Sequence, residues 1–371
     1  MRKIVINALQ YKKNNSGIGV MIRELFSRYA RITERRCELF LLRDIDDFPP
    51  IGRAVVENIP WTCEQGLRRT FFQLFVLGPK HCRDAILLTT DAKIPLLLPK
   101  SCTVVPLITD LAVYHLPETY QTSRVLLWKL QYRVLCRRAQ TFLAISEFTK
   151  RDIMETLHIP AERIHVVPCA SDEAMHRVTD ETQLRSIREK YQLPERFALF
   201  VGNTNPRKNL MRLLRAFDAA KERGLSHELV IAGGGGWKFD RGNALAEVRH
   251  KESVHFIGFV DDKDMPALYS ASDGFLFPTL YEGFGIPVIE AQRCGTPVLT
   301  SGCTSLPEVG GDGALYVDPY DTDGMTNGIL TLLQDKALAA DLVEKGYRNA
   351  ERFSWQASAE RLNAIIEEEF H

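Results

Sequence analysis

Short apolar runs alternate with segments of helical spacing along most of the chain. Apolar runs bounded by glycine or polar residues are typical of buried strands, and apolar residues three and four positions apart are typical of the helices between them. The alternation predicts an α/β fold with parallel sheets that are covered on both faces. We expect strands at 3–8, 39–42, 85–89, 103–108, 141–145, 164–167, 196–201, 229–232, 254–257 and 274–277.

The alternation stops between Ala170 and Pro194, where the chain is strongly charged and poor in apolar residues. We place the connection between two domains in this segment. Residues 1–175 then form the first domain and residues 190–353 the second. A chain of 371 residues is long enough for two cores of ordinary size.

Composition narrows the class of protein. No run of about 18 apolar residues occurs, and the apolar start of the chain turns polar at Asn7, too early for a signal peptide, so the expected compartment is the cytoplasm. The eight cysteines are scattered singly, which favours reduced core residues over a metal or disulfide framework. The net charge of zero divides into +8 for residues 1–172 (25 Lys and Arg against 17 Asp and Glu) and −8 for residues 173–371 (22 against 30). Opposite charges on the halves suggest different partners or two faces that attract each other.

The stretch 274–295 combines a strand, a tight glycine-bearing loop and a helix with proline in its first turn. A junction of this kind presents free backbone N–H groups and the positive end of the helix dipole, which together bind anions. The stretch also contains two carboxylates, Glu282 in the loop and Glu290 in the helix. We therefore expect it to form the centre of a ligand site.

Other strand ends in the second half also carry glycine or polar loops, at 202–209 and 233–236. Glycine at such places lets the backbone approach a ligand closely. Arg207 and Lys208 stand just before a helix start, where they suit a diphosphate, and Glu290 suits a ribose hydroxyl pair. Each has a structural alternative, a surface pair or a helix-face acid, but their coincidence at strand ends favours a nucleotide site.

The first half contains further candidates. The loop 12–19, which includes Gly17, links a strand to a helix, with a flexible loop as the alternative. Asp110 and His115 follow a buried strand directly, so they fall at the sheet edge where open α/β folds bind ligands. Their alternatives are a turn cap for Asp110 and a satisfied loop histidine for His115. Ser146 is expected to cap a helix.

A basic stripe marks the helix predicted over 124–138, with Lys129, Arg133 and Arg137 at a spacing of four. An anionic membrane surface is one explanation for such a stripe beside leucines. The solvated face of a helix packed on the core is the commoner one.

Together these motifs resemble the retaining glycosyltransferases of family 4. The resemblance is most specific over 202–318, and it extends more weakly to 16–19, 110–120, 144–150 and 166–168. It implies the GT-B architecture, in which two Rossmann-like domains face each other across a cleft. The acceptor binds to the first domain, the nucleotide sugar binds to the second, and a final helix, here within 354–371, crosses back to the first.

The resemblance also implies roles for individual residues. Glu282 would bind hydroxyls of the donor sugar, Glu290 the ribose, and Arg207 and Lys208 the diphosphate. The other donor-binding residues that it implies are Gly17, Gly202, Asn203, Phe259, Gly283, Phe284 and Gly285.

The expected reaction moves a hexose, with mannose favoured, from a GDP- or UDP-linked sugar to a hydroxyl of a glycan or polyprenyl-linked glycolipid in surface polysaccharide synthesis. Because Arg207 and Lys208 can stabilise the leaving diphosphate, we expect no metal or cofactor. The resemblance implies retention and places Glu290 on the ribose, which leaves no close pair of carboxylates, so we expect a front-face transfer. Asp110 is the candidate for positioning the acceptor. Thr109 departs from the family pattern, since many relatives have His there, which makes the role of this loop less secure.

Other classes of function remain open: a nucleotide-sugar epimerase or phosphorylase on the same fold, and a non-catalytic nucleotide-sugar-binding protein. The intact Lys208, Glu282 and Glu290 argue against the last. Nucleic acid is not an expected partner. A glycolipid acceptor would bring a cytoplasmic enzyme to the inner face of the cell membrane, so peripheral contact there stays an alternative.

Overall fold

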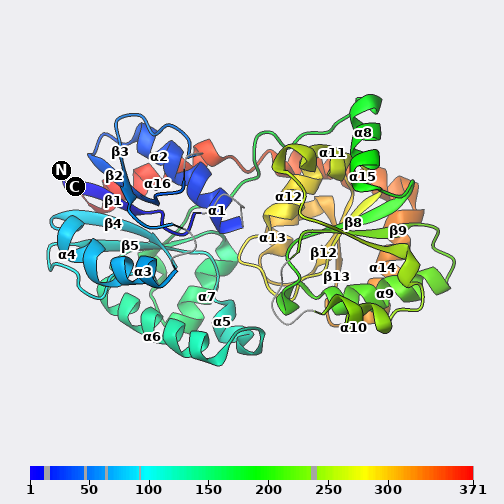
Figure 1. Cartoon of the computed structure of the whole chain (residues 1–371), viewed down its shortest axis with the longest axis horizontal. Helices are drawn as coiled ribbons and strands as arrows, with labels where there is room; N and C mark the ends of the chain where they lie inside the picture. The colour runs from blue at the N-terminus through cyan, green and yellow to red at the C-terminus, as the bar shows by residue number, and fades with distance from the viewer. Residues whose placement is uncertain (12–16, 46–47, 63–65, 92, 235–239, 371) are drawn as a thin grey trace. The chain divides into compact units, whose positions relative to one another are not determined.

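The structure is a computed structural model, and it describes the chain except residues 12–16, 46–47, 63–65, 92, 235–239 and 371 (Figure 1). The loop residues 12–16 and glycines 235–236 discussed above therefore lie outside the described residues. The chain divides into two compact units. The first contains Met1–Ala170 and Phe353–His371, and the second contains Ser171–Arg352.

The second unit begins earlier than the residue 190 chosen from the sequence. The charged segment placed between the domains contains helix α8 (Glu181–Tyr191), which packs against α11 (Met265–Ala271). Ile187 is the buried residue of this helix. A charged helix with a single buried residue leaves too weak a pattern to reveal that the segment belongs to a folded unit.

The first unit is built on a parallel sheet in the order β3-β2-β1-β4-β5-β6-β7. Its strands are β1 (Lys3–Asn7), β2 (Cys37–Leu42), β3 (Val55–Ile59), β4 (Ala85–Thr90), β5 (Thr103–Ile108), β6 (Phe142–Ala144) and β7 (Ile164–Val166). All except β3 coincide with predicted strands. The sequence pattern missed β3 because it is an edge strand whose first four residues, Val55 to Asn58, are exposed.

Helices cover both faces of this sheet. They are α1 (Gly17–Met21), η1 (Ile22–Phe26), α2 (Ser27–Ile32), α3 (Gly66–Phe71), η2 (Phe72–Val76), α4 (Leu77–His81), α5 (Ala112–His115), η3 (Pro117–Thr119), α6 (Thr122–Arg138), α7 (Glu147–Leu157), η4 (Ala161–Arg163) and α16 (Trp355–Glu369). Strands β2 and β4 are buried at every position, as expected of a sheet covered on both faces.

The second unit has a parallel sheet in the order β10-β9-β8-β11-β12-β13. Its strands are β8 (Phe197–Val201), β9 (Glu228–Ala232), β10 (Val254–Gly258), β11 (Gly274–Phe277), β12 (Val298–Ser301) and β13 (Ala314–Val317). Its remaining helices are η5 (Pro206–Lys208), α9 (Leu210–Glu222), α10 (Arg241–Ala246), η6 (Lys251–Ser253), η7 (Asp262–Asp264), α12 (Ile286–Arg293), α13 (Leu306–Gly310), η8 (Gly311–Gly313), α14 (Thr322–Gln334) and α15 (Lys336–Ala350). The expected α/β class is thus found in both units.

The last helix, α16, belongs to the first unit, where it packs against α2 and η1. Arg35 anchors its end: Nε and Nη2 donate to the two carboxylate oxygens of Glu367 at 2.7 and 2.8 Å, and Nη2 also donates to the carbonyl of Phe370 at 2.8 Å. Ser358 Oγ donates to the carbonyl of Pro168 at 2.7 Å. The return of the chain to the first unit is therefore fixed at both ends of the helix.

Replacing Arg35 by Ala should loosen the end of α16, because the side chain is 1% exposed and its bidentate pair would be lost. Glu367 is partly exposed, so we expect a cost of about 1–3 kcal/mol rather than that of a fully buried pair. The thermal unfolding midpoint of the variant measures this change. Arg36→Ala is the matched control, since Arg36 pairs with Glu38 but is 74% exposed. Equal unfolding midpoints for the two variants would contradict the prediction.

Candidate active site

Two neighbouring strands of the second sheet deliver charged side chains to one edge. After β8 the chain runs outward through β9 and β10, and it returns to pair β11 with β8. The carboxyl ends of β8 and β11 therefore lie at a switch point, where open α/β sheets bind ligands. The loop after β8 carries Arg207 and Lys208 on the short turn η5, and the loop after β11 carries Glu282.

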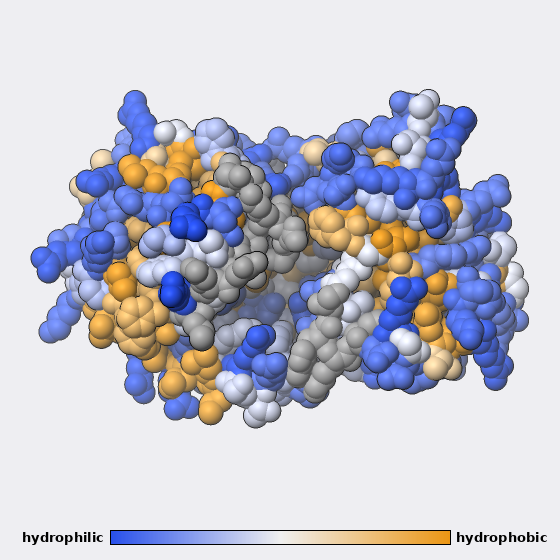
Figure 2. Space-filling model, in the orientation of Figure 1, coloured by the Kyte–Doolittle hydropathy of each residue, from blue (hydrophilic) through white to orange (hydrophobic). Residues whose placement is uncertain are grey.

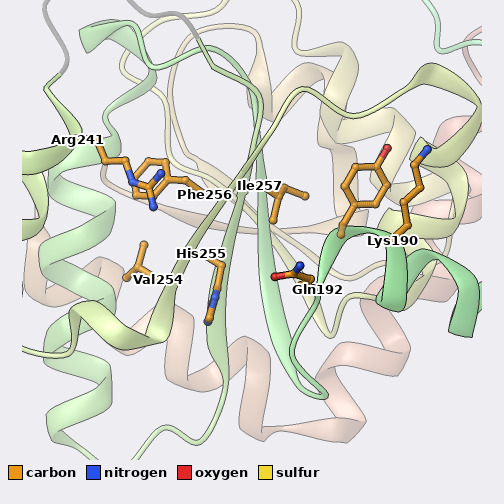
Figure 3. Close-up of a pocket in the computed structure, with 8 residues that line it drawn as sticks. Lys190, Gln192, Arg241, Val254, His255, Phe256 and Ile257 are labelled. Carbon is orange, nitrogen blue, oxygen red and sulfur yellow. The ribbon is translucent and has the colours of Figure 1, made fainter.

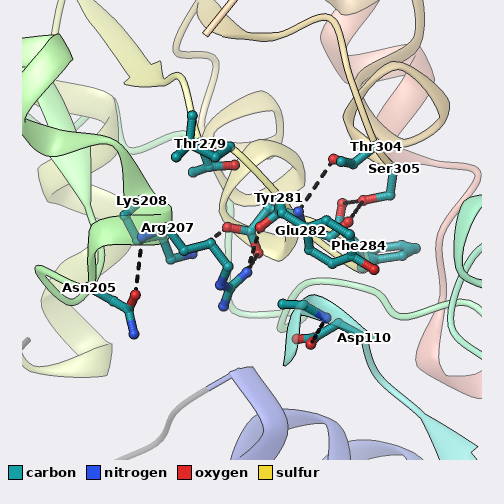
Figure 4. Close-up of polar contacts among 12 residues, drawn as sticks. Asp110, Asn205, Arg207, Lys208, Thr279, Tyr281, Glu282, Phe284, Thr304 and Ser305 are labelled. Atoms are coloured by element: carbon teal, nitrogen blue, oxygen red, sulfur yellow. Dashed lines mark hydrogen bonds and ion pairs between the residues drawn. The ribbon is translucent and has the colours of Figure 1, made fainter. Parts of the chain in front are cut away.

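Arg207, Lys208 and Glu282 form one ion-pair cluster (Figure 4). Lys208 Nζ lies 2.7 Å from Glu282 Oε1, and Arg207 Nη1 lies 3.0 Å from Glu282 Oε2. Arg207 Nη1 also donates to the carbonyl of Tyr281 at 2.6 Å, and Lys208 Nζ lies over the ring of Phe277 at 4.6 Å from its centroid. These three side chains, two cations and one anion, sum to a charge of +1, which favours an anionic ligand.

The two cations keep Glu282 ionised. Glu282 is only 8% exposed, and burial alone would raise the pKa of its carboxyl. The charges of Arg207 and Lys208 and their hydrogen bonds act in the opposite direction and hold the pKa below its ordinary value. Glu282 is thus held in place as an ionised hydrogen-bond acceptor.

Asn209 joins the two loops that carry these side chains. Its backbone adopts the left-handed conformation at φ 60°, which an asparagine tolerates better than most residues. Its side-chain amide donates to the carbonyls of Pro278 at 2.9 Å and Pro319 at 2.7 Å. Leu280 N also donates to the carbonyl of Arg207 at 2.9 Å. These bonds hold the Arg207 loop against the Glu282 loop.

Thr304 and Ser305 hold the Glu282 loop from its other side. Ser305 stands just before α13, where a serine usually caps the helix. Its hydroxyl instead donates to the carbonyls of Glu282 at 2.9 Å and Phe284 at 2.7 Å (Figure 4). Glu282 N donates to Thr304 Oγ1 at 3.3 Å. Neither residue was predicted from the sequence, because a Thr-Ser pair before a helix is typical of an ordinary cap.

Glu290 lies on α12 in a different environment. Tyr269 on α11 donates its hydroxyl hydrogen to Glu290 Oε2 at 3.0 Å. Burial raises the pKa of Glu290 to about 7, although the Tyr269 hydrogen bond acts against this shift. Tyr269 was not among the predicted site residues, because it lies 21 positions before Glu290 and no motif links the two. One glutamate of the stretch 274–295 is thus always ionised near neutrality, and the other changes its charge there.

Glycines form the rest of this sheet edge. Gly285 is the N-cap of α12 at φ 109°, and a Cβ atom there would lie 2.7 Å from Leu306 Cδ2. Gly233, also at φ 109°, would place a Cβ atom 2.3 Å from the carbonyl oxygen of Gly202. Only glycine fits such positions. Near them Gly283 and Phe284 are buried, whereas Asn203 and Phe259 are exposed.

The remaining site candidates belong to the first unit. Gly17 begins α1, and a Cβ atom there would meet open space. Asp110 follows β5 and accepts a hydrogen bond from Ala112 N at 3.0 Å, so the turn cap named as its alternative role is present. His115 lies 2.6 Å from Asp152, as expected of a satisfied histidine.

Thr109, the departure from the family pattern, is also fixed. Its backbone N and its hydroxyl donate to Asp91 Oδ1 at 2.9 and 2.7 Å. Ser146 accepts from Thr149 N at 2.9 Å and caps α7, which confirms the prediction for that residue.

A separate cavity of about 350 Å³ lies along the edge strand β10 of the second sheet (Figure 3). Arg241 stacks over the ring of Phe256 there, 4.6 Å from its centroid, and His255 pairs with Glu228. The cavity shares no lining residue with the Glu282 cluster. It therefore adds nothing to the candidate active site.

Comparison with known proteins decides the family. Residues 184–349 match the family model described as glycosyl transferases group 1, and residues 105–174 match the model described as glycosyltransferase family 4. O-antigen chain mannosyltransferase B of Escherichia coli is 34% identical to this chain over 69% of it and 68% of the relative. The chain belongs to glycosyltransferase family 4.

Other similarities of this family 4 glycosyltransferase are more distant. The serotype-specific mannosyltransferase WbdA of Escherichia coli is 31% identical over 60% of this chain, but the match spans only 28% of that longer protein. Alr3699/HepE of Anabaena, solved with UDP-glucose, superimposes with a TM-score of 0.75 at 15% identity, covering 99% of this chain and 100% of that one. The expected GT-B fold is confirmed.

Because Glu290 has a raised pKa, the stability of this glycosyltransferase should fall as the pH rises from about 5 to 8. The carboxyl has a reference pKa of 4.5 and a folded-state pKa of about 7. The folded state therefore binds more protons between these values, and ionisation at higher pH removes at most about 3 kcal/mol.

Thermal unfolding midpoints of the wild type and Glu290→Gln, measured across this range, test the expectation. The wild type should lose several degrees relative to the variant, since about 1 kcal/mol corresponds to a few degrees in a unit of this size. Glu344→Gln, which alters a side chain that is 75% exposed, is the control. Parallel curves for the wild type and Glu290→Gln would contradict the raised pKa.

Proposed function

We propose that this glycosyltransferase moves mannose from a nucleotide diphosphate sugar to a hydroxyl of a glycan or polyprenyl-linked glycolipid acceptor in surface polysaccharide synthesis, with retention at the anomeric carbon. The choice of sugar rests on its similarity to O-antigen chain mannosyltransferase B, and on the mannosyltransferases among its other relatives. The observation that carries the chemistry is the Glu282 cluster, in which Arg207 and Lys208 converge on one buried carboxylate at the carboxyl edge of the sheet.

In this proposal, different side chains of the cluster bind different parts of the donor. Arg207 and Lys208 lie at the carboxyl edge of the sheet, where they attract a diphosphate and stabilise the charge that develops on it as the sugar leaves. Glu282, kept ionised by the same cations, accepts hydrogen bonds from the sugar hydroxyls. A ligand that binds here replaces part of the internal ion pairing, so diphosphate and sugar engage the cluster together.

Retention without an enzyme nucleophile is the mechanism that suits these carboxylates. Glu282 is ion-paired to two cations, and Glu290 is bonded to Tyr269, so neither resembles the nucleophile of a retaining carboxylate pair. In the proposed front-face transfer, the bond from the anomeric carbon to the diphosphate oxygen breaks, and the acceptor oxygen bonds to that carbon from the same side. The departing phosphate oxygen takes the acceptor proton. Asp110 of the first unit is assigned to orient the acceptor.

The donor is tested by a thermal-shift screen of GDP-, UDP-, ADP- and dTDP-linked sugars, because a ligand that binds only the folded state raises its unfolding temperature. GDP-mannose should give the largest shift, with UDP-linked sugars as the second candidates. Mannose transfer with an α-linked product, and release of the nucleotide diphosphate only when a mannose-terminated acceptor is present, would support the function. Sugar conversion without acceptor would favour an epimerase, and binding without any turnover a non-catalytic protein. Added chelator should leave the rate unchanged.

Substitutions of the two glutamates should differ in their effects on nucleotide affinity and on kcat. Glu282→Gln removes the anion between the cations, so affinity for the nucleotide diphosphate should be kept or raised, while kcat falls on the order of a hundredfold. Glu290→Gln should instead weaken the nucleotide diphosphate on the order of tenfold, the loss expected for a charged hydrogen bond to ribose.

Calorimetry with the nucleotide diphosphate and initial-rate kinetics measure the two quantities independently. Lys208→Ala is the companion variant, because it should weaken the diphosphate where Glu282→Gln does not. Equal loss of nucleotide affinity in both glutamate variants would refute the proposed division.

A further inference from the structure

Helix α6 of the first unit exposes its leucines. Leu126, Leu127 and Leu130 are 73%, 49% and 56% exposed, and the buried residues of the helix are Tyr132 and Leu135. A helix that covers a sheet normally turns its leucines towards the core. Arg133 and Arg137 are exposed, as expected of the solvated face of a packed helix, but these three leucines are exposed as well.

The same helix carries only positive charge. Residues 119–146 contain no Asp or Glu, and α6 carries Arg124, Lys129, Arg133, Arg137 and Arg138. Leu126, Leu130, Arg133 and Arg137 follow one another at spacings of four, three and four, so they share one side of the helix. The exposed side thus passes from leucine in its first half to arginine in its second.

A second apolar patch is exposed on the same unit. Phe71 and Phe75, 57% and 42% exposed, have ring centroids 5.3 Å apart. Leu96 and Leu97, 47% and 56% exposed, lie beside them, because Leu96 N donates to the carbonyl of Leu74 at 2.8 Å. Residues 66–81 contain no acidic residue and carry Arg68, Arg69 and Lys80.

Both patches lie on one face of the first sheet. The connection from β3 to β4, with α3, η2 and α4, and the connection from β5 to β6, with α6, advance in the same direction across the strand order. Right-handed crossovers then place them on the same face, opposite the β1–β2 connection with α2. Figure 1 shows α3, α4 and α6 below the strands and α2 above them, and Figure 2 shows apolar side chains gathered over α3 and α6.

We propose that this docking face, formed by the exposed residues of α6 and of the α3–η2 segment, binds the surface of an anionic lipid bilayer. Leucine and phenylalanine side chains enter the boundary between headgroups and acyl chains, and arginines pair with lipid phosphates. Among the described residues, no helix is long and apolar enough to cross a membrane. The proposed contact is with the surface of the bilayer.

Charge complementarity selects this occupant. A second copy of the chain, docked through the same face, would set arginines against arginines and repel at short range. An anionic lipid surface offers negative charge opposite every arginine and a continuous apolar layer beneath, which suits two separate apolar patches at once. The proposal deepens the glycolipid acceptor of the proposed function and rests on it for its biological use, but binding to lipid can be measured without turnover.

Co-sedimentation with vesicles tests the docking face. The wild type should sediment with vesicles of phosphatidylglycerol and phosphatidylcholine, stay in solution with phosphatidylcholine alone, and be released as salt is raised. Leu126→Ser with Leu130→Ser, and separately Arg133→Gln with Arg137→Gln, should each lower the partition coefficient on the order of tenfold or more. Unchanged thermal midpoints would show that these variants fold, since the altered leucines are exposed.

Val55→Ser with Val56→Ser is the matched control, because these valines are exposed to a similar extent, 44% and 41%, on the edge strand β3. Equal losses in this control and the leucine variant, or equal binding to both vesicle types, would overturn the proposal. So would a dimer in solution that the leucine variant abolishes, which would make the face an interface between copies.

Transfer to a water-soluble acceptor separates this proposal from the proposed function. The leucine variant should retain that activity while losing vesicle binding. Vesicle binding in a protein with no transferase activity would uphold the docking face and refute the function, and activity without vesicle binding would do the reverse.

Discussion

The second unit is organised around one buried carboxylate held between two cations. Burial makes an unpaired Glu282 costly, and pairing with Arg207 and Lys208 offsets that cost only while both loops stay in place. The surrounding bonds serve that requirement: Asn209 ties the β8 loop to the β11 loop, and Ser305 holds the carbonyl of Glu282 itself. The proposed donor engages the same cluster that holds the two loops together, so folding and binding draw on the same charges.

The two glutamates of one short stretch show how environment overrides residue type. Glu282 meets its cations across 74 and 75 positions of sequence, and its pKa falls, whereas Glu290 meets a tyrosine hydroxyl and a drier setting, and its pKa rises to about 7. The sequence placed both acids in one expected ligand site, and the structure puts Glu282 in the loop at the switch point of the sheet and Glu290 on the helix that follows it. It gave no means of separating their ionisation, because the causes lie on other strands and helices.

Much of the fold could be predicted from the local sequence pattern. Where the prediction failed, the failure has a physical reason. Buried strands such as β5 and β11 were predicted to the residue, because a run covered on both faces is apolar throughout. The edge strand β3 lacks that signature, and α8 buries only one side chain, so neither element was predicted from the sequence. The family followed from glycine and charge motifs. The supports of the site, Asn209, Thr304 and Ser305, did not, because each has an ordinary capping role that the sequence favours equally. The exposure of the α6 leucines likewise depends on how the helix is rotated over the sheet, which spacing alone does not fix.

The hydrogen bond between Tyr269 and Glu290 has a thermodynamic consequence for any ligand that prefers the ionised acid. Near pH 7 this carboxyl carries its proton in about half of the molecules, because its pKa is about 7. Binding such a ligand then expels a fraction of a proton into solution. The heat of association consequently includes the heat released when the buffer captures that proton, so the apparent enthalpy differs between phosphate and Tris while the affinity at a fixed pH does not. The buffer dependence of the binding enthalpy therefore reports the protonation of Glu290 on the helix α12.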